Sequence, residues 1–103
     1  MLDSVSFPTS YASADHGQTA CFSVFARSDP GVMPRVLEVF AKRGLVPCQW
    51  YSTVCGPRGE SLHIDVQVAS MSAKLRERIA ESLRQVWTVE TVLTAEKRAA
   101  LSA

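Results

Sequence analysis

The 103-residue sequence has no apolar run close to the roughly 20 residues that a membrane-spanning helix needs. It also has no excess of one charge, because 11 basic and 10 acidic residues leave a formal net charge of +1. That balance gives no electrostatic reason to expect a nucleic acid or a membrane surface as a partner. Residues 1–18 lack a basic start followed by an apolar stretch and do not resemble a secretory signal, so we expect a cytoplasmic protein.

Cysteine is scarce and scattered, at Cys21, Cys48 and Cys55. An odd number of cysteines without a secretory signal argues against a disulfide framework, so we expect reduced thiols. A metal site needs paired cysteines or histidines at ligand spacing, and the sequence has neither. We therefore predict no metal and no cofactor, and we expect the cysteines to serve as small apolar side chains in the packing.

The pattern that is present alternates strand-like and helix-like segments separated by turn residues. Aromatic and β-branched runs predict strands, and apolar residues at spacings of three and four predict helices. The expected order is a strand at 19–27, a helix from the turn at 28–31 to Gly44, strands at 45–55 and 60–70, a helix starting after Ser70 or Ser72, and a strand at 87–94. We expect a domain over 19–94, an N-terminal tail or strap at 1–18 and a short C-terminal tail at 95–103.

The first helix has well-marked ends in the sequence. Ser28 or Asp29 can cap its N-terminus, Pro34 is tolerated only in the first turn, and Gly44 supplies a left-handed stop. Helical spacing predicts a core-facing side made of Met33, Val36, Leu37 and Phe40, which Val32 and Val39 widen.

The strand at 60–70 determines the expected architecture. Its apolar residues Leu62, Ile64, Val66 and Val68 alternate with polar ones, which predicts a sheet with one buried and one polar face. Right-handed crossovers return both helices to the apolar face. The sequence therefore predicts an α+β, ferredoxin-like βαββαβ fold: a four-stranded antiparallel sheet with the first and third strands in the middle and two helices on one face.

Catalysis and RNA binding find little support in the sequence. An RNA reader of this fold needs aromatic rings on the open face of the middle strands, and Phe25 has no ring expected across from it. His63 and Asp65 share a face and can hydrogen-bond, but no nucleophile motif accompanies them, so a solvated polar face is the better interpretation. Trp50 and Tyr51 are adjacent, so one ring should enter the core and the other should lie on the open face or at a subunit contact.

The turn Ser28-Asp29-Pro30-Gly31-Val32 is the most informative segment. It places a glycine at the start of a helix, where backbone N–H groups carry positive partial charge. Because Gly31 has no Cβ, a ligand can approach this backbone, and a carboxylate is the ligand group best suited to bind there.

From Cys21 to Thr94 the sequence resembles the ACT domain, the amino-acid-sensing module of biosynthetic enzymes. The resemblance rests on S-D-P-G-V-M-P-R-V-L-E-V-F-A-K-R-G-L, the Trp-Tyr-bearing strand, a Gly-Pro-Arg-Gly hairpin and L-H-I-D-V-Q-V. It is closest to the small, regulatory subunit of acetolactate synthase in its short, ACT-only form, through Arg35-Val36, Phe40 and Arg43-Gly44.

This resemblance implies a regulatory domain that is not itself an enzyme and that forms a homodimer through its second strand. It implies an amino acid effector, of the branched-chain type, and a catalytic synthase subunit as the regulated partner. Carried over by position, the ligand loop consists of Ser28, Asp29, Pro30, Gly31, Val32 and Met33, and the facing strand of the neighbour starts at Val46, Pro47 and Cys48.

A second hypothesis stays open. Acetolactate-type sensors commonly carry a polar amide where this sequence has Val46, so the polar groups that would hold an amino acid are depleted. The alternative is a ligand-independent structural or activating subunit whose sheet edges and open face dock another protein. An enzyme on the same fold has no supporting motif.

Overall fold

The computed structural model describes residues 18–98. The expected N-terminal tail at 1–18 therefore lies outside the described residues except for Gln18, as do residues 99–103. The element order confirms the expected βαββαβ arrangement. The elements are β1 (Gln18–Arg27), α1 (Val32–Ala41), β2 (Gln49–Cys55), β3 (Ser61–Ala69), α2 (Ala73–Arg84) and β4 (Val89–Arg98).

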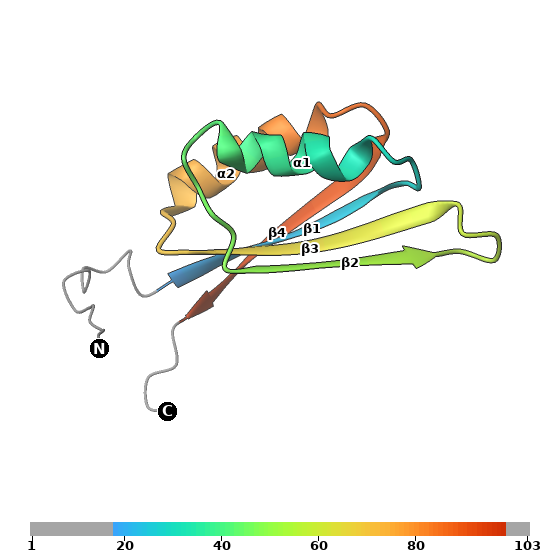
Figure 1. The fold of residues 1–103 in the computed structure, drawn as a ribbon. Coiled ribbons are helices and arrows are strands. Elements are labelled where there is room, and N and C mark those ends of the chain that lie inside the picture. The colour runs from blue at the N-terminus through green and yellow to red at the C-terminus, as the bar shows by residue number, and fades with distance from the viewer. Residues whose placement is uncertain (1–17, 99–103) are drawn as a thin grey trace, which may run out of the picture.

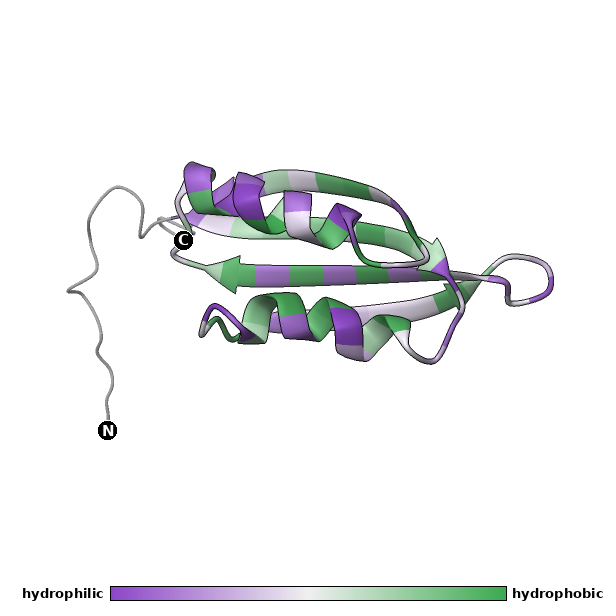
Figure 2. Cartoon of the chain, turned by 90° about the horizontal axis from the view of Figure 1, so that it is seen from above, coloured by the Kyte–Doolittle hydropathy of each residue, from purple (hydrophilic) through white to green (hydrophobic). Residues whose placement is uncertain are grey.

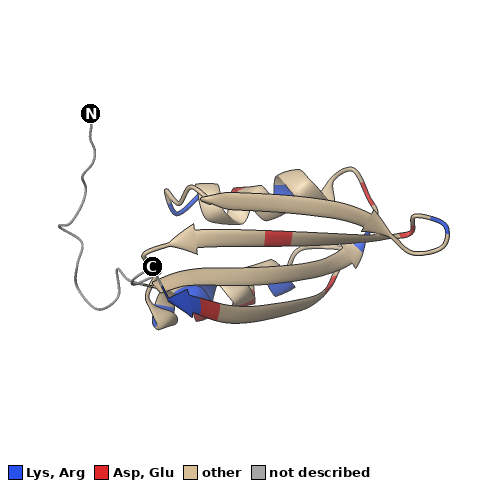
Figure 3. Ribbon diagram, turned by 90° about the horizontal axis from the view of Figure 1, so that it is seen from below, with Lys and Arg blue, Asp and Glu red and all other residues tan. Residues whose placement is uncertain are grey.

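The strands form a four-stranded antiparallel sheet in the order β2-β3-β1-β4, and both helices cover one of its faces (Figure 1). This is the ferredoxin-like fold predicted from the sequence, with β1 and β3 in the middle. The apolar and polar alternation along β3 is visible from the helix side (Figure 2). The opposite side is bare of helices in the described chain and is seen face-on in Figure 3; we call it the open face.

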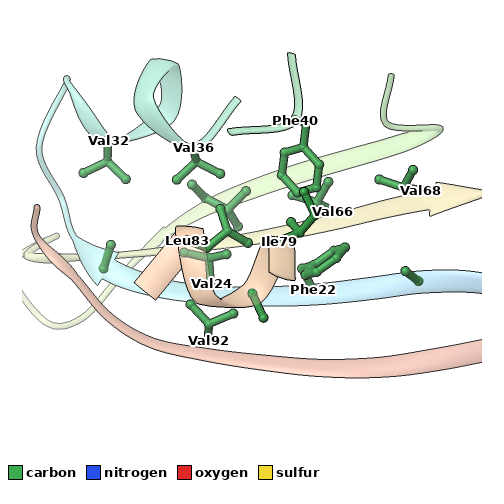
Figure 4. Packing of buried hydrophobic residues seen from close by; sticks show 14 of the residues in the cluster. Phe22, Val24, Val32, Val36, Phe40, Val66, Val68, Ile79, Leu83 and Val92 are labelled. Carbon is green, nitrogen blue, oxygen red and sulfur yellow. The ribbon is translucent and has the colours of Figure 1, made fainter. Parts of the chain in front are cut away.

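The core lies between the sheet and the two helices (Figure 4). Alternate residues of β1 and β3 point into it, because side chains along a strand project to opposite faces. Phe22 of β1 and Phe40 of α1 pack edge to face, with ring centroids 5.4 Å apart. The largest fully buried side chains are Phe22, Phe40, Ile64, Ile79, Leu83, Val24, Val32, Val36 and Val66.

The buried face of α1 differs from the predicted one. Val32, Val36 and Phe40, each four residues apart, are fully buried, whereas Met33 and Leu37 are 38% and 45% exposed. The predicted stripe was therefore only half right. The helix carries two parallel apolar stripes at the same spacing, and only the one that starts at Val32 faces the sheet.

The ends of α1 also correct the prediction in part. Gly31 is the N-cap, and neither Ser28 nor Asp29 caps the helix with its side chain. Pro34 falls in the first turn as expected, where its missing N–H costs no helical hydrogen bond. Gly44 adopts φ +69°, the left-handed stop that the sequence predicted.

Two strand boundaries were predicted wrongly. Residues 45–48 precede β2 rather than beginning it, although the Cys48 N–H donates to the Gln67 carbonyl at 2.8 Å. At the other end of the chain, β4 begins at Val89 and continues to Arg98, past the expected end at Thr94. Its last residues pair with β1, since Thr19 lies opposite Lys97.

Gly44→Ala is expected to destabilise the domain by about 1–2 kcal/mol, the cost of a left-handed conformation in a residue with a Cβ. No atom lies within 4 Å of the Cβ position, so backbone strain is the whole effect. Chemical denaturation measures the change. Gly44→Asn is the matched variant, and it should lose less because asparagine tolerates this conformation. An alanine variant as stable as the parent would contradict the assignment.

Candidate ligand-binding site

The loop between β1 and α1 is held tightly by backbone hydrogen bonds. The Ser28 N–H donates to the Glu60 carbonyl at 2.9 Å, which ties the loop to the end of the β2–β3 hairpin. The Val32 N–H donates to the Asp29 carbonyl at 3.0 Å, and the Gly31 N–H donates to the Asp29 carboxylate Oδ1 at 2.8 Å. The start of α1 is therefore rigid and already holds an anionic group from its own chain.

This arrangement corrects the expectation of a helix start with free N–H groups. Gly31 and Val32 donate within the loop, and Pro34 has no N–H. Within residues 18–98, the Met33 N–H is the one in the first turn for which the structure gives no acceptor. A ligand carboxylate would find a single backbone donor here, so other groups must contribute if one binds.

Arg35 is the residue of this site that sequence reasoning missed. Its guanidinium Nη1 occupies the space that a Cβ on Gly31 would need, and Asp29 Oδ1 lies 3.4 Å from the same point. Arg35 is exposed and has no carboxylate partner among the ion pairs of the described residues. Arg35 could have been found from its position four residues after Gly31, which places it one helical turn along the same side of the helix.

The other half of the predicted site lies elsewhere in the chain. Val46, Pro47 and Cys48 follow α1, whereas residues 28–31 precede it, so the two sets lie at opposite ends of the helix (Figure 1). A helix of ten residues is about 15 Å long. A single chain therefore does not bring the predicted site residues together. Val46 is 82% exposed, while the Val32 side chain is fully buried in the core and unavailable to a ligand.

An apolar strip runs along the β2 edge of the molecule on the side of the helices. Met33 and Leu37 of α1 and Val54 of β2 are exposed, with Val54 at 60%. The Ser52 hydroxyl lies 3.5 Å from the Met33 sulfur, which places the first turn of α1 beside the middle of β2. We call Met33, Leu37 and Val54 the edge strip. It borders a strand edge that has no partner strand within the described chain.

The open face carries a pair of stacked rings. Phe25 of β1 and His63 of β3 are opposite each other, with ring centroids 4.4 Å apart and planes at 9°. The expectation that Phe25 has no ring across from it was wrong, because the imidazole of His63 fills that position. The two rings cover each other, so no base can stack between them, and the neighbouring Asp65 would repel a phosphate.

A polar network adjoins these rings. His63 Nε2 lies 3.3 Å from Asp65 Oδ1, and the Ser23 hydroxyl donates to the same oxygen at 2.9 Å. The predicted proximity of His63 and Asp65 is confirmed. The carboxylate lies between the serine and the histidine, so the imidazole does not contact the Ser23 hydroxyl and cannot activate it as a general base. The adjacent rings also divide as predicted: Trp50 packs against the core and Tyr51 is 62% exposed.

The cysteines do not fill the core as predicted. Cys48 and Cys55 are exposed, because one precedes β2 and the other ends it, and Cys21 is half-buried on the open face. Burial raises the pKa of the Cys21 thiol, which keeps it protonated and poorly nucleophilic. Within residues 18–98, no three histidine, cysteine or acidic side chains cluster in a way that could hold a metal ion.

The fold places the chain in the class of ferredoxin-like α+β domains. Residues 13–100 match the model of the ACT-like domain, and the chain belongs to this family. ACT domains are small-molecule regulatory domains of metabolic enzymes and are usually not catalytic. No helix in the described part of the chain is long and apolar enough to cross a membrane.

Solved structures share the fold at low sequence identity. The ACT domain of GTP pyrophosphokinase from Chlorobium tepidum superposes with a TM-score of 0.63 at 13% identity, covering 75% of this chain and 96% of that one. The ligand-free regulatory subunit of aspartate kinase from Thermus thermophilus gives a TM-score of 0.60 at 16% identity, covering 78% of this chain and 51% of that one. The C-terminal domain of MgtC from Mycobacterium tuberculosis gives 0.63 at 12% identity, covering 85% and 96%. A search of curated proteins found no match.

Proposed function

We propose that this ACT-like domain is a homodimeric amino acid sensor that regulates a biosynthetic enzyme, with one effector site formed between two copies. The observation that carries the proposal is the separation of the two half-sites. Residues 28–33 and 46–48 lie at opposite ends of α1, and the β2 edge beside that helix is unpaired within the described chain. In the proposed dimer, a second copy brings the two half-sites together.

The geometry of an antiparallel strand pair supports this assembly. If two β2 strands pair antiparallel about a two-fold axis, the start of one strand lies beside the end of the other. The end of β2 and the β2–β3 hairpin lie on the same side of the molecule as the loop at 28–31, to which Glu60 is hydrogen-bonded. Residues 46–48 of the second copy would then face the ligand loop of the first, and the two edge strips would cover each other.

The loop offers groups for both ends of a zwitterion. The Arg35 guanidinium and the Met33 N–H are suited to the α-carboxylate, since guanidinium groups bind carboxylates in a planar, bidentate manner. The Asp29 carboxylate is suited to the α-ammonium group. Val46 of the second copy, exposed and apolar, suits an aliphatic effector side chain. These groups favour a branched-chain amino acid over a polar one.

The identity of the regulated enzyme follows from sequence resemblance. Arg35-Val36, Phe40 and Arg43-Gly44 match the pattern of the acetolactate synthase small subunit. That enzyme class acts in branched-chain amino acid biosynthesis, so feedback by such an effector is chemically consistent. We therefore propose a catalytic synthase subunit as the partner, located in the cytoplasm. An effector needs only a few kcal/mol of differential affinity to shift such a partner between two states.

One observation favours a second candidate. Asp29 already occupies the N–H of Gly31 and places a negative charge at the helix start. If that charge rejects an effector carboxylate, the dimer is a ligand-independent activating subunit that works through its edges and faces.

A thermal-shift screen of the twenty proteinogenic amino acids separates the two candidates. An effector at 100 times its Kd stabilises the native state by about 2.7 kcal/mol, which should raise Tm by roughly 10 °C. We expect a branched-chain amino acid to give the largest shift. Arg35→Gln should abolish the shift, and Arg78→Gln on α2 should retain it. A flat response to all twenty would favour the activating subunit.

A further inference from the structure

The open face has a regular layout around one carboxylate. In register, Tyr51 of β2, Asp65 of β3, Ser23 of β1 and Leu93 of β4 form one row across the sheet. Tyr51 and Leu93 at the ends of this row are 62% and 57% exposed. The next row contains the stacked Phe25 and His63. Asp65 therefore has the Tyr51 ring beside it in its own row and the stacked rings in the next row, with Leu93 at the far end of the sheet.

A shallow depression of about 170 Å³ adjoins this carboxylate. It is smaller than the about 300–1,000 Å³ typical of sites for small-molecule ligands, and it is sized for the end of one side chain. Its polar walls come from three strands. The residues that line it are Cys21, Phe22, Gln49, Tyr51, Asp65, Val66 and Gln67.

The carboxylate in this depression lacks a strong cationic partner. Ser23 and His63 both approach Oδ1, and the structure gives Oδ2 no partner among residues 18–98. No lysine or arginine of the described chain pairs with Asp65. Asp65 is 44% exposed, so water solvates Oδ2 in the single chain. A guanidinium group would replace that water and pack against the exposed ring of Tyr51.

No lysine or arginine lies in the middle of the open face within residues 18–98. Residues 1–17 and 99–103 contain no lysine or arginine. Arg27 and Lys97 are at the ends of β1 and β4, so a second copy has no cation in the middle of this face. Figure 3 shows that most of the open side is uncharged.

We propose that the open face docks a separate protein, which inserts an arginine flanked by apolar side chains beside Asp65. Four strands about 4.8 Å apart and nine residues at about 3.3 Å per residue make a face of roughly 19 by 30 Å. A contact of that size belongs to transient complexes. This surface is separate from the effector site, because it lies on the side of the sheet away from α1.

The test is an NMR titration of the ¹⁵N-labelled 103-residue chain with the peptides Ac-Leu-Arg-Leu-NH₂ and Ac-Leu-Glu-Leu-NH₂. We expect saturable shifts at the amides of Cys21, Tyr51, Asp65 and Gln67 with the arginine peptide only. Asp65→Asn should weaken that binding about tenfold, the loss of one charge-assisted contact, and Tyr51→Ala should weaken it through loss of the exposed ring. Glu81→Gln on α2 is the matched control and should bind as the parent does.

Three results would overturn the proposal. Equal shifts with both peptides would show that charge plays no part. If Asp65→Asn bound the arginine peptide as the parent does, or if the amide shifts were confined to the helix side, the peptide would bind elsewhere on the molecule. Concentration-dependent shifts of the same amides without peptide would identify a second copy as the occupant. The first two results leave the proposed effector site untouched, because its residues are intact in every variant. The third would also count against a dimer formed through β2, which sedimentation of Val54→Asp and Leu93→Asp tests separately.

Discussion

Phe40→Ala is expected to lower the free energy of unfolding by about 3–5 kcal/mol, the range for truncating a buried phenylalanine. Phe40 is fully buried, and its edge-to-face contact with Phe22 fixes α1 to the middle of the sheet. A domain of this size has about 5–15 kcal/mol of stability in total. Urea denaturation should therefore show a midpoint close to zero denaturant if the parent lies at the low end of that range.

Leu37→Ala is the matched control on the same helix. Leu37 is 45% exposed, so its truncation should cost at most about 1 kcal/mol. Because Leu37 also belongs to the edge strip, unfolding should be followed at two protein concentrations, which separates an effect on folding from an effect on dimerisation. A loss from Leu37→Ala equal to that from Phe40→Ala would mean that α1 presents its other side to the sheet.

These two residues also show what periodicity can decide. Along β3, polar residues separate the apolar ones, so a period of two identifies the buried face without ambiguity. Along α1, Val32 and Met33 each begin an apolar stripe at spacing four. Periodicity gives both stripes equal weight, and the choice depends on how the loop at Gly31 directs the helix onto the sheet. That direction is a tertiary property.

The position of the loop at 28–31 in the fold was predictable from the sequence, and its hydrogen bonding was not. Turn residues identified the loop at 28–31, and its place between β1 and α1 is as expected. That Asp29 turns its carboxylate onto the Gly31 N–H depends on side-chain conformation, which spacing does not determine. The segment at 45–48 has strand-like composition, but Pro47 has no N–H to donate, and ladder pairing begins only at Gln49.

The open face illustrates a related difficulty. Alternation places His63 on the polar face and allows Phe25 to lie there, but their contact depends on the register between β1 and β3, which are distant in sequence. No hairpin joins these strands, so no turn type fixes their alignment. The register between β1 and β3 is known only from the folded sheet. The stacked pair and the row through Asp65 both depend on that register.

Val54→Asp is expected to raise the dimer Kd at least about 30-fold. The substitution places a charge in the edge strip, where the second copy would bury it without a partner at a cost of about 2–5 kcal/mol. Val54 is 60% exposed in the single chain, so the monomer should fold as the parent does. Sedimentation equilibrium measures the change in Kd, and the variant should also lose the thermal shift with the effector, because residues 46–48 would no longer meet the loop at 28–33.

Leu93→Asp separates the β2 edge from the open face as the surface of self-association. Leu93 is 57% exposed, a fraction similar to that of Val54. It lies on the opposite side of the sheet, on the strand farthest from β2. We expect its dimer Kd and its effector response to match those of the parent. If Leu93→Asp dissociates the dimer while Val54→Asp does not, the copies meet through their open faces. In such a dimer, residues 46–48 of one copy would not reach the loop at 28–33 of the other. An effector site shared between two chains would then be geometrically impossible.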